Sequence, residues 1–156
     1  MAREQIPVAK RASSIEYAIR DVVVPATKLE SEGHEILKLN IGDPIAYPGL
    51  PTPKHMVDAY VDALQNGNNG YSPSYGLPQL RAAIAQDERR KGWPARQDDI
   101  YVCHGVTEAL QVIFAATLEE GDIVLAPGPH YPPYMAYPQM YGAHTVEYKL
   151  KPNDGW

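Results

Sequence analysis

Short apolar runs alternate with helical stretches along residues 98–150, and this alternation is the clearest pattern in the chain. Residues 99–103, 123–126 and 145–150 are each rich in residues that favour strands. Residues 109–118 are apolar on almost every side, so we predict a buried helix there. A second helical stretch separates the last two runs. Elements in this order predict right-handed parallel βαβ units, with helices on the faces of the sheet.

The first hundred residues carry mainly helical patterns. Residues 54–65 place apolar side chains near helical spacing, and a proline-initiated helix is expected over about residues 78–90. Residues 13–16 have the spacing of a capping box, which predicts the start of another helix. Residues 36–41 alternate apolar and polar positions like a strand. The sequence therefore predicts an α/β protein in which an N-terminal helical arm precedes a mostly parallel sheet.

Ligands in such folds bind beyond the carboxyl ends of the strands. Two turns are expected at that edge, Gly105-Val106-Thr107 before the apolar helix and residues 127–134 after the second predicted strand. A helix N-terminus offers backbone N–H groups and a favourable dipole to an anion, and the Thr107 hydroxyl adds a donor. The commoner role of such a threonine is to cap a buried helix. The turn alone leaves both roles open.

Composition and charge exclude several classes of function. The 156 residues are 44% hydrophobic and 21% charged, and the net charge is −5. This charge argues against nucleic acid as the main partner, because phosphate backbones require a positive surface. No apolar run reaches the roughly 18 residues of a membrane span, and the start of the chain lacks the apolar core of a secretory signal. One cysteine permits no internal disulfide, the five histidines show no metal-ligand spacing, and we expect a cytoplasmic protein.

Four motifs occur in order along the chain, at residues 39–44 (LNIGDP), 71–77 (YSPSYGL), 105–110 (GVTEAL) and 127–134 (PGPHYPPY). Any one of them is a weak signal, but four in this order and spacing are a strong one. With them, the chain from about Arg11 onward resembles the N-terminal portion of a fold-type I, pyridoxal-phosphate-dependent aminotransferase of class I/II. The nearest subgroup is the alanine-aminotransferase-like enzymes.

The resemblance implies an aspartate aminotransferase-like fold that is incomplete in this chain. Residues 1–46 would form an N-terminal arm and the start of a small domain, and residues 47–156 the first part of the large cofactor-binding domain. It also implies pyridoxal 5′-phosphate as cofactor, an amino acid and a 2-oxo acid as substrates, and a homodimer. The final turn has no closing helix or strand after it, which likewise leads us to expect the opening part of a larger fold.

The resemblance assigns contacts with the cofactor to several residues. Gly105, Val106 and Thr107 are implied to hold its phosphate, and Tyr131 is implied to stack against its pyridine ring. Stacking by a tyrosine holds a ring at little cost in side-chain entropy. The alternative for Tyr131 is a core or surface tyrosine, since the chain has 11 tyrosines.

Two further residues are assigned in the same way. Tyr71 is implied to reach across a dimer interface to the cofactor phosphate of the partner subunit, and the backbone N–H of Gly42 is implied to face the substrate carboxylate. The alternatives are a tyrosine packed under the turn at Pro73 and a turn glycine with positive φ.

The catalytic groups of the family have no matching position here. They are the Schiff-base lysine, an aspartate paired with the pyridine nitrogen, an asparagine and a tyrosine near the ring oxygen, and an arginine for the substrate carboxylate. None of the seven lysines stands in the family's lysine context. Because that lysine also moves the proton at Cα, we predict that this chain alone does not catalyse amino transfer.

The sequence is compatible with three functions. The first is part of an aminotransferase acting on alanine or a similar amino acid. The second is another fold-type I enzyme with the same cofactor, such as a lyase, a synthase or a decarboxylase. The third is a non-catalytic remnant that binds a partner or dimerises through apolar surface that would otherwise be exposed. The sequences of residues 39–44 and 105–110 favour the aminotransferase over the other fold-type I enzymes.

Overall fold

The computed structural model describes residues 6–13, 15, 21–40, 42–46 and 49–155. These residues fall into two compact units, each described here by itself. The first unit consists of Met1–Asn40 together with His104–Trp156, and the second is Ile41–Cys103. The division into domains at residues 46 and 47 stays a prediction.

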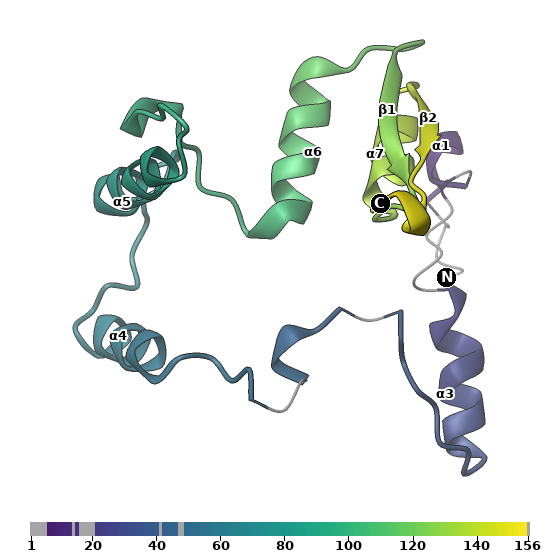
Figure 1. The fold of residues 1–156 in the computed structure, drawn as a ribbon, viewed down its shortest axis with the longest axis horizontal. Coiled ribbons are helices and arrows are strands. Elements are labelled where there is room, and N and C mark those ends of the chain that lie inside the picture. Colours follow the sequence, from purple (N-terminus) through teal and green to yellow (C-terminus); the bar gives the residue numbers. More distant parts are fainter. Residues whose placement is uncertain (1–5, 14, 16–20, 41, 47–48, 156) are drawn as a thin grey trace, which may run out of the picture. The chain divides into compact units, whose positions relative to one another are not determined.

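The first unit contains the parallel sheet that the alternation of apolar runs predicts (Figure 1). Strand β1, Ile123–Gly128, pairs in parallel with strand β2, His144–Lys149, and Leu125 lies opposite Val146. Helix α7, Pro133–Met140, connects the two strands and contacts both of them. The βαβ unit predicted for residues 123–150 is therefore confirmed.

The core of this unit lies between helix α6, Gly105–Thr117, helix α7 and one face of the sheet. Phe114, Ala136 and Tyr137 are buried together there, and Val124 of β1 packs against them. The opposite face of the sheet stays open, since Leu125 is 66% exposed and its neighbour Val146 48%.

The N-terminal part of this unit is helical over short stretches. Helix α1 spans Lys10–Ser13 and helix α3 spans Val23–Ser31. Gly33 follows the end of helix α3, and its φ of 92° suits a glycine. The helix start predicted from residues 13–16 falls largely outside the described residues. A short 3₁₀ turn, Pro152–Asp154, follows β2.

The second unit is built around two helices that match the predicted ranges. Helix α4 spans Lys54–Gln65 and helix α5 spans Pro78–Arg90. Short 3₁₀ turns occupy Pro44–Ala46 and Gln97–Asp99, and α5 contacts the second of these turns. No helix of the described part of the chain is long and apolar enough to cross a membrane.

The strand predicted over residues 99–103 is wrong. Residues 97–99 form a 3₁₀ turn, and the segment that follows is extended but has no strand beside it in the described structure. A β-ladder needs the N–H and C=O groups of a neighbouring strand. The backbone here instead bonds to Tyr75, whose carbonyl accepts the N–H of Val102 at 3.1 Å, and to the side chain of Arg81.

Two other predictions from apolar patterning are also wrong. Residues 36–40 form an irregular segment with a turn, and Leu37 and Leu39 are 80% and 84% exposed; Ile41 lies outside the described residues. Helix α6 is not buried on all sides, because it contacts only α7 among the described elements. Its Phe114 is buried, whereas its Ile113 is 53% exposed.

Candidate cofactor site

The first turn of α6 has a row of backbone donors without an acceptor in the described part of the chain. His104 precedes the helix, and Gly105 has φ +77°, a conformation that favours glycine. None of the described residues accepts a hydrogen bond from the backbone N–H groups of Gly105, Val106 or Thr107. Three adjacent donors at the positive end of a 13-residue helix are suited to an anion.

The side chain of Glu108 bonds to His104 rather than to these three donors. Its carboxylate accepts the backbone N–H of His104, and its Oε2 lies 3.0 Å from Nδ1 of the same residue. These contacts, the backbone N–H first and the ring second, lower the pKa of Glu108 below its ordinary value. Glu108 therefore leaves the N–H groups of residues 105–107 available.

The second predicted turn brings Tyr131 to the same place. Tyr131 follows the carboxyl end of β1, after Gly128 and Pro129, which are joined by a cis peptide bond. Its hydroxyl oxygen lies 3.3 Å from Oγ1 of Thr107, and the residue is 39% exposed. Two residues assigned separately from the sequence thus meet at the carboxyl end of β1, where a ligand was expected.

Tyr134 fixes the shape of this turn. The rings of Tyr131 and His130 both meet the ring of Tyr134 edge to face, with centroids 6.5 Å and 6.4 Å apart. The hydroxyl of Thr145 on β2 donates a hydrogen bond of 2.7 Å to the carbonyl oxygen of Tyr134. Tyr134 therefore has a structural role, as Tyr137, which is 9% exposed, has in the core.

His130 and Glu147 form a contact that the sequence did not predict. Nε2 of His130 lies 2.6 Å from Oε1 of Glu147. The available signal was the position of Glu147 on β2, opposite Ala126 of β1, because Ala126 is buried on the packed face of the sheet. The side chain of His130 is 11% exposed and that of Glu147 is 50% exposed, so the contact lies at the border of that face.

Gly42 and Tyr71 lie in the second unit, and their roles stay predictions. Tyr71 is fully exposed. Gly42 is exposed, and a Cβ added to it would meet no atom within 4 Å. Its φ is outside the left-handed region, so the alternative of a turn glycine with positive φ does not apply.

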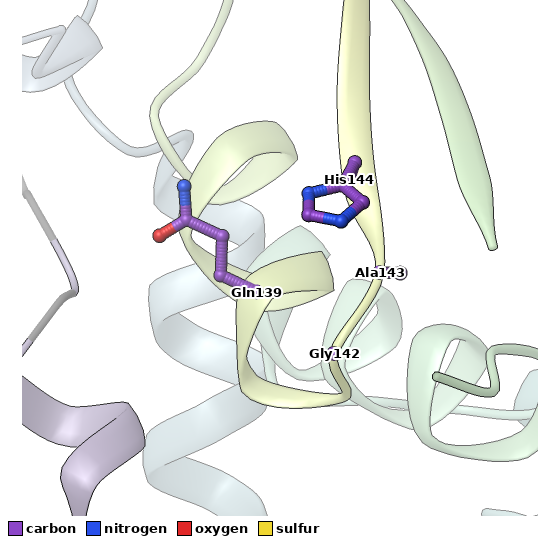
Figure 2. Close-up of a pocket in the computed structure, with 4 residues that line it drawn as sticks. All are labelled: Gln139, Gly142, Ala143 and His144. Atoms are coloured by element: carbon purple, nitrogen blue, oxygen red, sulfur yellow. The ribbon is translucent and has the colours of Figure 1, made fainter. Parts of the chain in front are cut away.

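A shallow depression lies at the other edge of the sheet and is not the predicted site. Figure 2 shows Gln139 at the end of α7 and His144 at the start of β2, with Gly142 and Ala143 between them. The amino end of β2 is opposite the edge that carries Thr107 and Tyr131. Within the described ranges, no group of three or more histidine, cysteine, aspartate or glutamate side chains is arranged to hold a metal ion.

The sequence model of the class I and II aminotransferases matches residues 34–156. The chain belongs to this family. It is 38% identical over 133 residues to the alanine aminotransferase of Mycobacterium tuberculosis, which covers 84% of this chain and 30% of that protein. It is 33% identical over 155 residues to the glutamate-pyruvate aminotransferase AlaA of Escherichia coli, covering 97% of this chain and 37% of that protein.

The solved structures agree with the sequence comparison. An alanine aminotransferase from Pyrococcus furiosus matches with a TM-score of 0.89 and 48% identity, over 96% of this chain and 38% of its own. An aspartate aminotransferase from Thermus thermophilus matches with a TM-score of 0.80 and 29% identity, over 97% and 39%. The resemblance and the fold class predicted from the four motifs are confirmed. The chain spans about a third of the length of these aminotransferases.

Proposed function

We propose that this chain is part of a pyridoxal-phosphate-dependent aminotransferase that moves an amino group between an alanine-like amino acid and a 2-oxo acid. The observation that carries the proposal is the meeting of Thr107 and Tyr131 beside three N–H groups that have no acceptor among the described residues. The turn at residues 105–107 offers hydrogen-bond donors to a phosphate dianion. The turn after β1 offers the partly exposed ring of Tyr131, whose hydroxyl contacts that of Thr107. Family membership supports the same function.

The residues present fit the phosphate and the ring of the cofactor. Gly105, Val106 and Thr107 would bind the phosphate through their backbone N–H groups, and the Thr107 hydroxyl would add a fourth donor. Tyr131 would lie against the pyridine ring and orient it. When bound, the cofactor supplies the aldehyde and the electron-withdrawing ring that weaken the bonds at Cα of an amino acid. The described site residues therefore bind and orient, and no lysine of this chain is assigned to the chemistry.

Substrate and partner are proposed on the same basis. Alanine is proposed because the Mycobacterium tuberculosis and Pyrococcus furiosus relatives are named alanine aminotransferases. Gly42 would offer its N–H to the substrate carboxylate. Tyr71, which is fully exposed, would reach the cofactor phosphate of the partner subunit in a cytoplasmic homodimer.

The test uses the complete polypeptide purified from its natural source. We expect it to bind pyridoxal phosphate, with a shift of the cofactor's absorption, and to convert L-alanine and 2-oxoglutarate to pyruvate and glutamate. Failure to bind the cofactor would contradict the proposal. Binding followed by release of carbon dioxide or ammonia would instead indicate a decarboxylase or a lyase. The 156-residue chain alone should show no amino transfer above the rate with free cofactor.

A further inference from the structure

We propose that His130 and Glu147 form a positioning pair that holds Tyr131 in the orientation needed to stack on the cofactor ring. The inference rests on the proposed function, because it assigns to this pair the orientation of a residue that contacts the cofactor. Neither member is proposed to touch the cofactor.

The pair connects the turn after β1 to the neighbouring strand. The side chain of His130 is only 11% exposed, and its Nε2 lies 2.6 Å from Oε1 of Glu147, whose side chain is 50% exposed. Among the described residues Nε2 of His130 has no hydrogen-bond partner, so its contact with Glu147 is a close approach that is an ion pair when the imidazole is protonated. A carboxylate beside a largely enclosed imidazole interacts more strongly than an exposed pair, because water screens it less.

The other ring nitrogen of His130 faces Tyr131 itself. Its Nδ1 lies 3.2 Å from the backbone carbonyl oxygen of Tyr131. Both nitrogens of His130 thus face oxygen atoms, Nδ1 the carbonyl oxygen of Tyr131 and Nε2 the carboxylate of Glu147. The imidazole joins β2, through Glu147, to the peptide unit that carries the Tyr131 side chain.

The surrounding backbone leaves room for this arrangement. A Cβ added to Gly128 would lie 3.2 Å from Oε2 of Glu147, so the absence of a side chain there admits the carboxylate. Thr145, two residues before Glu147, bonds to the carbonyl oxygen of Tyr134. The turn is therefore attached to β2 at two points, one on each side of Tyr131 in the sequence.

The experiment compares cofactor binding by variants of the complete polypeptide. Glu147→Gln removes the charge at nearly constant volume, and His130→Gln removes the imidazole. Glu119→Gln is the matched control, because Glu119 is exposed in the turn before β1, at the other end of that strand. We expect each variant of the pair to weaken pyridoxal phosphate binding about three- to tenfold, the range of a partly enclosed ion pair. The control should bind like the wild type. The induced circular dichroism of the bound cofactor should fall in the pair variants only.

A double-mutant cycle separates positioning from a general structural role. If the pair acts through Tyr131, Glu147→Gln should no longer weaken binding once Tyr131→Ala has removed the ring. Additive losses, or losses no larger than in Glu119→Gln, would overturn the pairing proposal. If Glu147→Gln does not fold, the cycle is run with Glu147→Asp, which keeps the charge but shortens its reach.

The outcomes distinguish this inference from the proposed function. A wild-type polypeptide that does not bind the cofactor, or a Tyr131→Ala variant with unchanged affinity, would contradict the role given to Tyr131 in the proposed function. An effect of Tyr131→Ala without any effect of the pair variants would contradict the positioning pair alone.

Discussion

The hydroxyl oxygens of Thr107 and Tyr131 lie 3.3 Å apart, although 24 residues separate the two in sequence. Thr107 is in the first turn of α6, and Tyr131 follows the carboxyl end of β1. A hydroxyl group donates one hydrogen bond and accepts two. If the Tyr131 hydroxyl donates to Thr107, the Thr107 hydroxyl keeps its own proton for an anion at the helix N-terminus. The contact therefore links the proposed ring-stacking residue to the proposed phosphate site.

Replacing Thr107 tests the phosphate role directly. Thr107→Val keeps the shape of the side chain but removes its donor, and we expect pyridoxal phosphate to bind about tenfold more weakly, because a hydrogen bond to a charged group contributes ~1.5 kcal/mol or more. Thr107→Ser keeps the hydroxyl and serves as the control, with affinity close to that of the wild type. Absorption titration of the complete polypeptide measures both. Equal losses in the two variants would show that the hydroxyl does not bind the phosphate.

Two substitutions of Tyr131 separate the contribution of its ring to cofactor binding from that of its hydroxyl. Tyr131→Phe retains the aromatic face and loses the hydroxyl, which contacts Thr107, so we expect affinity to fall about two- to fivefold, in line with the loss of a partly exposed hydrogen bond. Tyr131→Ala also loses the ring and should fall about tenfold further, since aromatic stacking adds ~1 kcal/mol or more beyond burial. Cofactor titration of the two variants provides the measurement. A Tyr131→Ala variant that binds as well as Tyr131→Phe would rule out stacking.

The sequence predicted helices α4 and α5 correctly because short-range features mark them. Helix α4 has the expected bounds because its apolar spacing marks it, and α5 begins at Pro78, where proline suits a first turn. The two turns that carry Thr107 and Tyr131 were expected at one edge of the sheet, and the structure brings the two hydroxyl oxygens within 3.3 Å of each other. The prediction of a strand over residues 99–103 failed because residues that favour strands form one only beside a partner strand. Whether a partner strand is present depends on tertiary contacts.

The close approach of Gly76 to Val102 was invisible in the sequence and gives a stability prediction. Gly76 has φ +96°, and a Cβ added there would lie 2.6 Å from Cβ of Val102. Gly76→Ala should lower the free energy of unfolding by ~2–4 kcal/mol, from the strained backbone and the overpacking together. Gly92→Ala is the control, because Gly92 has φ +93° but nothing within 4 Å of the added atom. It should cost only about 1–2 kcal/mol. Urea unfolding of both variants measures the difference, and equal losses would contradict the steric part of the argument.

Arg81 holds the segment that was expected to be a strand. Its Nε and Nη2 donate hydrogen bonds of 2.9 Å to the carbonyl oxygens of Ile100 and Gln97, and its side chain is 13% exposed. Arg81→Met would leave both carbonyls without this donor, at a cost of ~1–3 kcal/mol each if they stay buried. We expect faster hydrogen exchange at the amides of Ile100 and Val102. Arg96→Met, at a side chain that is 81% exposed, is the control and should change exchange at Val102 little.

The ion pair of Arg96 and Asp99 predicts how the stability of the fold changes at acidic pH. The hydrogen bonds from the Arg96 guanidinium, and then from its backbone N–H, lower the pKa of Asp99 from 3.8 to about 2. A carboxyl group whose pKa is lower in the folded state stabilises that state above its unfolded pKa, and the contribution is lost as the pH falls toward the folded value. Stability should therefore decline between about pH 4 and pH 2, although modestly, because the side chain of Arg96 is mostly exposed. Arg96→Gln should raise the pKa of Asp99 toward 3.8 and remove this part of the decline. Carboxyl carbon chemical shifts across a pH titration report the Asp99 pKa in both proteins. An Asp99 pKa near 3.8 in the wild type would show that the pair does not form in solution.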